Sequence, residues 1–498
     1  MTWDAIVIGA GHNGLIAAAR LGQAGKRVLV LEAREAPGGL MAARGGMTVA
    51  MLPTALNADV ARALDLHRHG LSYGAPVATL ALGAGGAVRI SGREASGAGK
   101  AVAVAYGALH DRLTRQAAAL GRMLMKTPPR LRDGGAGDLI ALARMGLGIR
   151  LLGKDEMRDL LRILLSNIWD VLNDEIGDGP LAAALAMEAT LGGAMGPRSP
   201  GTVLPLLYRM AGRGRLRALG GPDAVIAALV RAVGAGGGAI RTGAEVARIL
   251  VGEDDRAGGV RLTTGEEIRA PLILSNAHPR RTLNDLLGVA HLDAEDARRA
   301  RLMASTGMVA RLDFALSGAP VADGGMAIPS GERLIVAGNM AALETAFNAA
   351  KYKEIPDRPV LECTYEAGRG LLSVNAQFVP CEVKGGWTDK ARATLEGNVR
   401  AVLAGAMPGF QAMIAGVETL TPADIEARFG LPGGHWHHGE FRVDQMLMMR
   451  PFGGAAQYRM PVAGLYLCGA GAHPGGDITG VPGWNAAGQA LKDGRAAK

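Results

Sequence analysis

Asp4-Ala-Ile-Val-Ile-Gly-Ala-Gly-His-Asn-Gly14 is the stretch of this 498-residue chain that decides its fold. Residues 5–8 form a short apolar run of the kind found in buried parallel strands. Gly9, Gly11 and Gly14 follow at G-x-G-x-x-G spacing. The first glycine permits a tight turn, the second lets the backbone approach a pyrophosphate, and the third allows close packing of helix on strand. The stretch therefore predicts the start of a dinucleotide-binding unit.

The residues that follow complete a strand–helix–strand unit. Residues 15–23 suit a helix, and residues 28–31 suit a second buried strand. Glu32 comes directly after that strand, where a carboxylate can accept hydrogen bonds from the ribose hydroxyls of a nucleotide. Residues 234–238 are equally rich in glycine, but they lie between a predicted helix and a strand and are interpreted as a turn.

A second glycine pair favours FAD over NAD. Gly38 and Gly39 follow Pro37 soon after the ribose acid. Such a pair is typical of FAD enzymes and resembles the flavin motif of the amine oxidase and phytoene desaturase superfamily, whereas NAD dehydrogenases usually lack it. The alternative is an ordinary glycine turn after the second strand.

The composition is that of a globular protein of two or three domains. Hydrophobic residues make up 49% of the chain and charged residues 20%. Aromatic residues make up only 4%, which leaves few side chains for stacking on bases, and the net charge of +8 is spread along the sequence. Both features argue against a nucleic-acid-binding protein.

Cysteine usage and hydropathy favour a cytoplasmic protein. Cys363, Cys381 and Cys468 are far apart and form no C-x-x-C pair, so neither a disulfide framework nor a zinc site is indicated. The first predicted strand begins at residue 5, which leaves no room for a signal peptide. No run of about 18 apolar residues is free of charge.

Residues 139–172 form a basic, amphipathic helical pattern. Packing of these helices on a substrate domain is the favoured interpretation, and peripheral contact with an anionic membrane is the alternative. Residues 80–105 are rich in glycine and alanine and predict strands and turns. Further predicted elements are a helix over 220–233, a strand over 239–251 that leads into a β-meander, a buried strand over 464–468 and a C-terminal helix that opens at 481–483 and includes 485–492.

Five motifs, two of them long, point to one family. Residues 431–445 read Leu-Pro-Gly-Gly-His-Trp-His-His-Gly-Glu-Phe-Arg-Val-Asp-Gln and run on to Met449-Arg-Pro451. Residues 464–476 are followed by Thr479-Gly-Val-Pro-Gly483. The shorter motifs are residues 4–39, Gly243-Ala-Glu-Val246 and Ser275-Asn-Ala277. With these motifs, nearly the whole chain resembles the flavoprotein group around phytoene desaturase, and within it the branch of the pyridine nucleotide-disulfide oxidoreductase domain-containing protein 2 type.

The resemblance implies an α/β fold, a Rossmann-like FAD-binding domain of the amine oxidase and phytoene desaturase type with an inserted α+β substrate domain. Residues 1–75, 210–285 and 455–498 are expected to form the discontinuous FAD-binding domain, and residues 76–209 and 286–454 the substrate-binding domain. The residues expected to contact FAD are Gly9, Gly11, Gly14, Glu32, Ala33, Gly38, Gly39, Val246, Gly469, Ala470, Gly480 and Val481.

Two positions depart from the family pattern. Relatives often carry an acid, a glycine and a histidine where this chain reads Val49-Ala-Met-Leu-Pro-Thr54. Relatives usually carry a glycine where this chain has Asp477. Both changes fall where flavin or substrate is expected, so the desaturase reaction does not transfer directly to this chain.

The candidates for proton transfer are histidines and one acid in the C-terminal motifs. His473 and Asp477 follow the strand expected at 464–468, so they are the first candidates near the flavin, with hydrogen bonding inside the loop as the alternative. His437 and His438 are further catalytic candidates. A metal site formed by the histidines of this motif and Glu440 is the less favoured interpretation, because flavin redox chemistry needs no metal, and none is expected.

We therefore expect an FAD-dependent oxidoreductase that transfers hydride between the flavin and a largely apolar, unsaturated or saturable small molecule held in an apolar pocket. Three alternatives stay open: a redox-neutral isomerase, an amine or alcohol oxidase, and a non-catalytic flavin-containing binding protein. No second nucleotide motif is present, so the expected electron acceptor is oxygen, a quinone, another protein or a transiently bound nicotinamide. The substrate, the direction of the reaction and the choice between monomer and homo-oligomer stay open.

Overall fold

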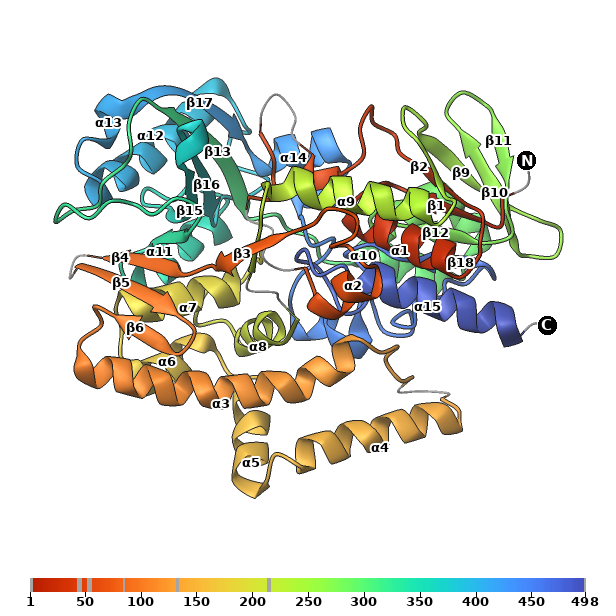
Figure 1. Ribbon diagram of the computed structural model, residues 1–498, viewed down its shortest axis with the longest axis horizontal. Helices are drawn as coiled ribbons and strands as arrows, with labels where there is room; N and C mark the ends of the chain where they lie inside the picture. The colour runs from red at the N-terminus through yellow and green to blue at the C-terminus, as the bar shows by residue number, and fades with distance from the viewer. Residues whose placement is uncertain are drawn as a thin grey trace.

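The computed structural model describes residues 3–42, 47–51, 56–83, 86–130, 134–212 and 216–496. Two lobes share the chain, each built around its own β-sheet (Figure 1). One lobe carries the ends of the chain, and the other contains the largest sheet. Thr54, part of the departure noted at residues 49–54, lies outside the described residues.

The first lobe is a Rossmann-like domain with a five-stranded sheet. All neighbouring strands in this sheet pair in parallel. Each of the first two strands is buried along its whole length, which explains their continuous apolar sequence. In sheet order the strands are β18 (Leu465–Leu467), β12 (Ile273–Ser275), β1 (Ala5–Ile8), β2 (Val28–Leu31) and β8 (Ala239–Arg241).

Three helices pack around this sheet. The first helix, α1 (His12–Gln23), packs between α9 (Gly221–Ala235) and α15 (Val481–Ala496). The contact with α15 is close because a Cβ on Gly483 would lie 2.0 Å from the carbonyl oxygen of Asn13. The predicted fold class is therefore confirmed for this lobe.

The boundaries differ from the sequence-based expectations in two places. α1 begins at His12, three residues before the predicted helix, whereas α15 begins at Val481, where the helix was expected to open. The single strand expected over 239–251 is two strands, because the chain turns after β8 and leaves the parallel sheet. The second part is β9 (Val246–Val251), which forms the predicted meander with β10 (Ala257–Leu262) and β11 (Glu267–Arg269).

The second lobe contains a mixed eight-stranded sheet. Its strands pair antiparallel except for one parallel pair, β14 with β4. In sheet order the strands are β17 (Ile414–Leu420), β13 (Val309–Leu316), β16 (Leu371–Gln377), β15 (Val360–Glu366), β14 (Arg333–Val336), β4 (Thr79–Gly83), β5 (Gly86–Ser91) and β6 (Glu94–Ser96). β3 (Tyr73–Pro76) and β7 (Leu216–Ala218) form a separate two-stranded ribbon. Each of them stands in the sequence where the chain passes from one lobe to the other.

The two faces of the eight-stranded sheet differ in polarity. Leu361, Cys363 and Val374 belong to an apolar core that also contains Leu395 and Val399 of α12 (Asp389–Ala406). Since side chains alternate along a strand, the residues between them point to the other face. That face carries buried polar side chains, namely Arg311, Asp313, Arg333, Glu362, Thr364, Ser373, Asn375 and Gln377.

Helices cover the lower part of this lobe in Figure 1. They are α3 (Lys100–Leu124), α6 (Ile168–Ile176), α7 (Pro180–Thr190), α8 (Val203–Gly212) and α11 (Met340–Lys351). The remaining helices are α2 (Ala58–Ala63), α10 (Ala294–Leu302), α13 (Phe410–Met413), α14 (Pro422–Phe429) and the π-helix Arg281–Gly288. Short 3₁₀ turns span Gly39–Met41, Val289–His291, Ala367–Arg369, Pro432–Gly434, Val443–Gln445 and Leu447–Met449. The strands and turns expected over 80–105 end at Ser96, and α3 follows from Lys100.

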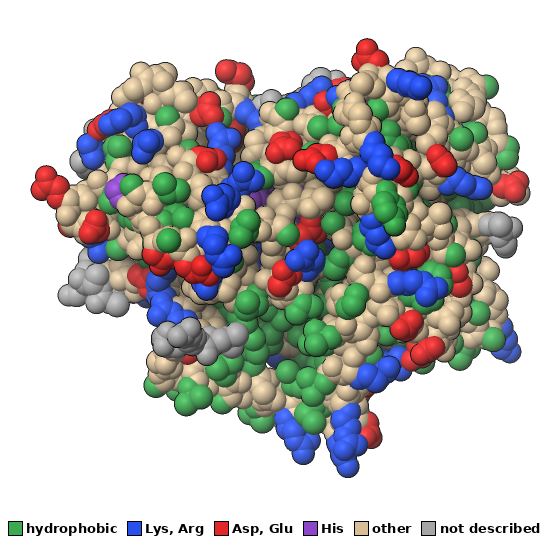
Figure 2. Space-filling view, turned by 180° about the vertical axis from the view of Figure 1, so that it is seen from behind, with side chains coloured by type: hydrophobic (Ala, Val, Ile, Leu, Met, Phe, Trp, Pro, Cys, Tyr) green, Lys and Arg blue, Asp and Glu red, His purple; other side chains and the backbone are tan. Residues whose placement is uncertain are grey.

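The basic amphipathic stretch forms an arm, α4 (Ala136–Arg150) and α5 (Lys154–Ile163), which lies beneath α3 in Figure 1. α4 has no buried residue, and Leu139 and Leu151 are 69% and 71% exposed. Figure 2 shows hydrophobic side chains gathered along the lower edge of the molecule, with basic ones beside them. In the described part of the chain, no helix has the length and apolar character needed to cross a bilayer. Peripheral membrane contact of this arm stays a prediction.

Candidate functional site

One cavity of about 640 Å³ extends from the Rossmann-like sheet to the polar face of the eight-stranded sheet. Its volume lies in the range of cofactor and ligand sites. We call its three parts the nucleotide end, the middle and the far end. The nucleotide end includes Gly9, Gly11, Glu32, Ala33, Gly39 and Val246; the middle includes Arg209, His437, His438, Ala470 and Asp477; the far end includes Glu188, Arg333, Glu362, Thr364 and Asn375.

At the nucleotide end, the glycine motif forms the turn from β1 into α1. A Cβ on Gly14 would lie 2.1 Å from the carbonyl oxygen of Gly9, so no larger residue fits there. Gly11 is the N-cap of α1 and lines the cavity. The positive end of the helix therefore faces this part of the cavity, which suits a phosphate group.

The second glycine pair lies directly on the first glycine loop. The Gly38 N–H donates to the carbonyl oxygen of Ala10 over 2.9 Å. A Cβ on Gly39 would lie 3.2 Å from the Gly11 Cα, and the φ of Gly39 is +57°. The sequence pattern Pro-Gly-Gly is thus explained by contact between two backbones at one edge of the cavity.

Glu32 is buried beside these loops and is 6% exposed. Its Oε2 accepts a hydrogen bond from the Ala10 N–H over 2.7 Å, and its Oε1 accepts one from the Arg34 N–H over 3.1 Å. The carboxylate is therefore held in place at the end of β2. Among the described residues lining this end, the three arginines Arg34, Arg281 and Arg428 outnumber the two acids Glu32 and Glu245, which favours an anionic ligand.

The loop after β18 meets the glycine loop through Asn276. The Asn276 Nδ2 donates to the carbonyl oxygen of Gly9 over 3.4 Å, and a Cβ on Gly469 would lie 2.6 Å from the Asn276 carbonyl oxygen. Ala470 lines the cavity. Gly14, Gly38, Gly469, Gly480 and Val481 are expected cofactor residues that are not among the described residues lining the cavity; they shape or support the loops around it.

Arg450 joins the two long C-terminal motifs. Its guanidinium is fully buried and donates hydrogen bonds to the carbonyl oxygens of Ala470, Glu440 and Gln445, at 2.8–3.0 Å, and to that of His437. Burial lowers the pKa of Arg450 to about 10, so the side chain is charged at neutral pH. The arginine holds the histidine-containing loop against the Gly469–Ala470 turn.

Asp477 lies in the middle of the cavity, beside Arg209 and His437. Its Oδ2 accepts a hydrogen bond from the Nε of Arg209 over 3.1 Å, and its Oδ1 lies 3.8 Å from the Nε2 of His437. The Asp477 backbone N–H donates to the Nδ1 of His437 over 3.1 Å. The carboxylate is therefore part of a buried ion pair with Arg209, which comes from α8.

His437 and His438, which line the middle of the cavity, are neutral. Burial, together with the charges of Arg209 and other neighbours, lowers the pKa of His437 well below its usual value. Burial also lowers the pKa of His438 to about 3. The His437 ring stacks on Phe441 with ring centroids 4.4 Å apart. A neutral imidazole in this position can orient a ligand, but its lowered pKa makes it a weak base, and it carries no spare proton to donate as imidazolium.

His473 does not reach the cavity. Its ring is 2% exposed, and its two nitrogens lie 3.1 Å from the carbonyl oxygen of Leu447 and 3.4 Å from that of Met123. The chain folds back between these segments, which turns the ring away from the place expected from its position in the motif. This placement favours a supporting role in the loop for His473.

The third histidine of the cluster pairs with the acid. The His435 Nε2 lies 3.4 Å from the Glu440 Oε1, and Glu440 also accepts hydrogen bonds from the Ala194 and Thr306 N–H groups over 3.0 and 2.9 Å. Against the effect of burial, His435 and these N–H groups lower the pKa of Glu440. Among the described residues, no group of three or more His, Cys, Asp or Glu side chains is arranged to hold a metal ion.

Sequence reasoning missed the partners supplied by the insertion. Arg209 and Arg333 stand on elements that show no recognisable motif. One feature of β15 does point to the site. Glu362 and Thr364 alternate with apolar residues along this strand, and both the apolar and the polar side chains are buried. A buried polar stripe on a strand marks either a ligand site or a polar network.

Comparison with known proteins agrees with this architecture. A family model described as an NAD(P)-binding Rossmann-like domain matches residues 7–58. Pyridine nucleotide-disulfide oxidoreductase domain-containing protein 2 of Rattus norvegicus is 29% identical, over 99% of this chain and 94% of the relative. Hydroxyneurosporene desaturase of Cereibacter sphaeroides is 28% identical, over 96% and 94%. The chain is a homologue of both.

These two homologues confirm the resemblance derived from the motifs. Their names identify one as an oxidoreductase domain protein and the other as a desaturase. A solved structure of putrescine oxidase bound to putrescine aligns over all of both chains, with a TM-score of 0.58 and 14% identity. At this identity the alignment shows that the two proteins share a fold.

Replacing Asp477 with glycine tests the departure from the family pattern. The φ of Asp477 is +60°, so glycine relieves backbone strain of about 1 kcal/mol. The change also leaves the buried Arg209 guanidinium without its carboxylate, which costs about 3 kcal/mol or more. We expect a net loss of about 2 kcal/mol in urea denaturation. Asp477→Asn is the matched control, since it keeps a hydrogen-bond acceptor for Arg209; equal stability of Asp477→Gly and wild type would contradict the ion pair.

Proposed function

We propose that the protein is an FAD-dependent oxidoreductase that transfers hydride between the flavin and a carbon atom of a small molecule. The observation that carries this proposal is the single cavity that connects the glycine loops with the far end. A dinucleotide at one end and a substrate at the other would meet in the middle of this cavity. Two relatives that align with nearly the whole chain, one named as an oxidoreductase domain protein and one as a desaturase, support the same class of chemistry.

The residues at the nucleotide end fit FAD. Glu32 is held in place to accept hydrogen bonds from ribose hydroxyls, and the N-terminus of α1 faces the place of the pyrophosphate. Val246, at the start of β9, lines the same end, where its backbone suits an adenine. The Gly469–Ala470 turn and the start of α15 would flank the flavin ring.

When bound, FAD supplies the acceptor or donor of the hydride. The protein positions the substrate and excludes water. Arg209, Asp477 and His437 converge on the middle of the cavity, where their hydrogen bonds fix each other's orientation. Neutral His437 and His438 are suited to orient a substrate through hydrogen bonds, and their lowered pKa makes both of them weak bases, whereas His473 takes no part in this proposal.

Anaerobic mixing of the purified protein with candidate substrates, followed by flavin absorbance, tests the proposed function. Bleaching of the flavin by a substrate supports hydride transfer. Turnover that requires prior reduction and consumes no electrons would instead show a redox-neutral isomerase. A protein that neither contains nor takes up FAD would contradict the proposal.

Glu32→Ala is expected to weaken FAD binding at least tenfold without unfolding the protein. The physical reason is the loss of charge-assisted hydrogen bonds to the ribose, each of about 1.5–3 kcal/mol. Titration of the apoprotein with FAD measures the change. Glu35→Ala is the control, because Glu35 is exposed and is not among the cavity-lining residues described. Unchanged affinity in Glu32→Ala would show that Glu32 is not the ribose acid.

A further inference from the structure

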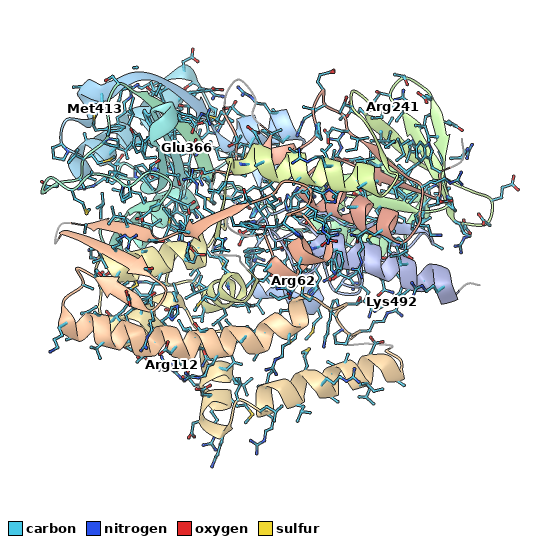
Figure 3. The ribbon with its side chains drawn as sticks, viewed as in Figure 1. Arg62, Arg112, Arg241, Glu366, Met413 and Lys492 are labelled. Atoms are coloured by element: carbon cyan, nitrogen blue, oxygen red, sulfur yellow. The ribbon has the colours of Figure 1, made fainter. Side chains whose placement is uncertain are left out.

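We propose that His278 and His12 bind the ribityl chain of FAD, the polyhydroxyl segment that joins the diphosphate to the flavin ring. This inference rests on the proposed function and gives a role to two histidines to which the sequence motifs assign none. Both residues line the cavity, His12 at the start of α1 and His278 shortly after the end of β12. Side chains of both lobes crowd the region where the lobes meet (Figure 3).

The two histidines stand where the nucleotide end of the cavity passes into the middle. Glu32 suits the adenosine ribose and the N-terminus of α1 suits the diphosphate, so the ribityl chain has to leave the diphosphate towards the middle. His12 is the first residue of α1 and hydrogen-bonds to the backbone of Asp477, which lies in the middle. The His278 ring lies beside that of His438, with ring centroids 5.8 Å apart. Both rings therefore border the path of the ribityl chain.

His278 offers a hydrogen-bond donor to a ligand. Its Nδ1 accepts a hydrogen bond from the Arg280 N–H over 3.1 Å. Burial lowers the pKa of His278 well below its usual value, so the ring is neutral and its one N–H proton lies on Nε2. The side chain is 1% exposed, and the Nε2 has no partner among the described residues. A buried donor without a partner is costly, so this position suits a ligand that accepts a hydrogen bond.

His12 offers a hydrogen-bond acceptor. Burial lowers the pKa of His12 to about 4, against the opposite effect of its hydrogen bond to the Asp477 backbone. A hydrogen bond that favours the charged ring is one that the ring donates. The buried Nε2 of His12 has no partner in the described part of the chain. The donated proton therefore lies on Nδ1, and the Nε2 of the neutral ring is left with a free lone pair.

Hydroxyl groups satisfy both nitrogens. A hydroxyl donates one hydrogen bond and accepts others, so it can bind either the Nε2–H of His278 or the lone pair on the His12 Nε2. A diphosphate only accepts hydrogen bonds and would face that lone pair, and a hydrocarbon would leave both nitrogens unpaired. The ribityl chain carries hydroxyls along its length, so each histidine can bind one of them. These contacts would fix the chain that determines where the flavin ring lies.

Calorimetric titration of the apoprotein with FAD and with ADP tests the proposal, because ADP has the adenosine and the diphosphate but no ribityl chain. His278→Leu removes the donor, and we expect about tenfold weaker binding of FAD and unchanged binding of ADP. His278→Gln keeps an N–H donor near the position of Nε2 and should recover most of the FAD affinity. Unchanged FAD affinity in His278→Leu, or an equal loss for ADP and FAD, would overturn the proposal.

His12→Leu and modified cofactors provide a second test. His12→Leu removes the acceptor and should weaken FAD about fivefold, again with no change for ADP. FAD analogues that each lack one ribityl hydroxyl identify the contact of His278. For the analogue without the contacted hydroxyl, wild type and His278→Leu should bind equally, since the interaction is already lost. If His278→Leu weakens every analogue as much as it weakens FAD, the ring does not bind the ribityl chain.

His291→Leu is the matched control. His291 is exposed and is not among the described residues that line the cavity. We expect this variant to bind FAD and ADP like wild type. A wild-type protein that binds FAD no better than His278→Leu and His12→Leu would leave the proposed function intact and remove only the ribityl contacts, whereas a wild-type protein that cannot hold FAD would remove the proposed function.

Discussion

Acidification from pH 7.5 to pH 5.0 is expected to lower the free energy of unfolding by roughly 6 kcal/mol through three histidines alone. Burial lowers the pKa of His12 and His473 to about 4 and that of His438 to about 3. His278 and His437 are shifted in the same direction by burial. All five side chains are held neutral in or beside the candidate site.

The free energy of unfolding falls on acidification because the unfolded chain binds more protons than the folded protein. In the unfolded chain a histidine binds a proton below about pH 6.5, whereas in the folded protein these rings stay neutral until about pH 4 or lower. Between these pH values the unfolded state binds more protons than the folded state. The stabilisation that the neutral rings provide is therefore complete above pH 6.5 and is lost as the pH falls. Each ring contributes about 2 kcal/mol over the stated range.

Urea denaturation at a series of pH values measures this effect. His473→Gln should make the loss between pH 7.5 and pH 5.0 smaller by about 2 kcal/mol, because one buried ring is removed. His67→Gln is the control, since His67 is exposed, and its slope should match wild type. A free energy of unfolding that is constant over this range would contradict the neutral, buried state of the histidines.

Arg450→Ala is expected to destabilise the protein by about 4 kcal/mol and to reduce FAD retention. The change removes a fully buried guanidinium and leaves the carbonyl oxygens of His437, Glu440, Gln445 and Ala470 without their donor. Unsatisfied buried acceptors cost about 1–3 kcal/mol each, partly offset by relaxation of the loop. The histidine loop and the Gly469–Ala470 turn would also lose their common contact.

Thermal and urea denaturation, together with the flavin content after purification, measure this effect. Arg442→Ala is the matched control, because Arg442 lies in the same motif, is only half-buried and pairs with Asp444 near the surface. An exposed pair of this kind contributes at most about 1 kcal/mol. A loss below 1 kcal/mol in Arg450→Ala would show that the carbonyl contacts do not hold the loop.

Local sequence was sufficient to predict the Rossmann-like domain. A four-residue apolar strand, the glycines of a tight turn, a helix and an acid are adjacent in sequence, and each follows from short-range geometry. The Pro-Gly-Gly motif could be assigned to the same site because it follows the first glycine loop by only about 24 residues in the sequence. The start of α15 at Val481 agrees with the predicted opening of this helix, whereas α1 begins at His12, before the apolar pattern does.

The contents of the substrate side could not be predicted in this way. His473 and Asp477 are four positions apart in one loop, yet one ring is buried against distant carbonyls and the other side chain faces the cavity. Which of the two reaches the site depends on the segments that pack against the loop, namely residues near Met123 and Leu447. These contacts join residues hundreds of positions apart or in separate motifs.

The dinucleotide-binding unit, the family resemblance and the place of the C-terminal loops can be derived from the sequence alone, because those features depend on backbone turns and short-range spacing. The contacts of Arg209 with Asp477 and of Arg333 with Glu188 and Glu362 arise only in the folded protein. The physical reason is that strand register and helix packing bring these charges together from separate segments. A buried charge requires a partner, but its own neighbours in the sequence do not identify that partner.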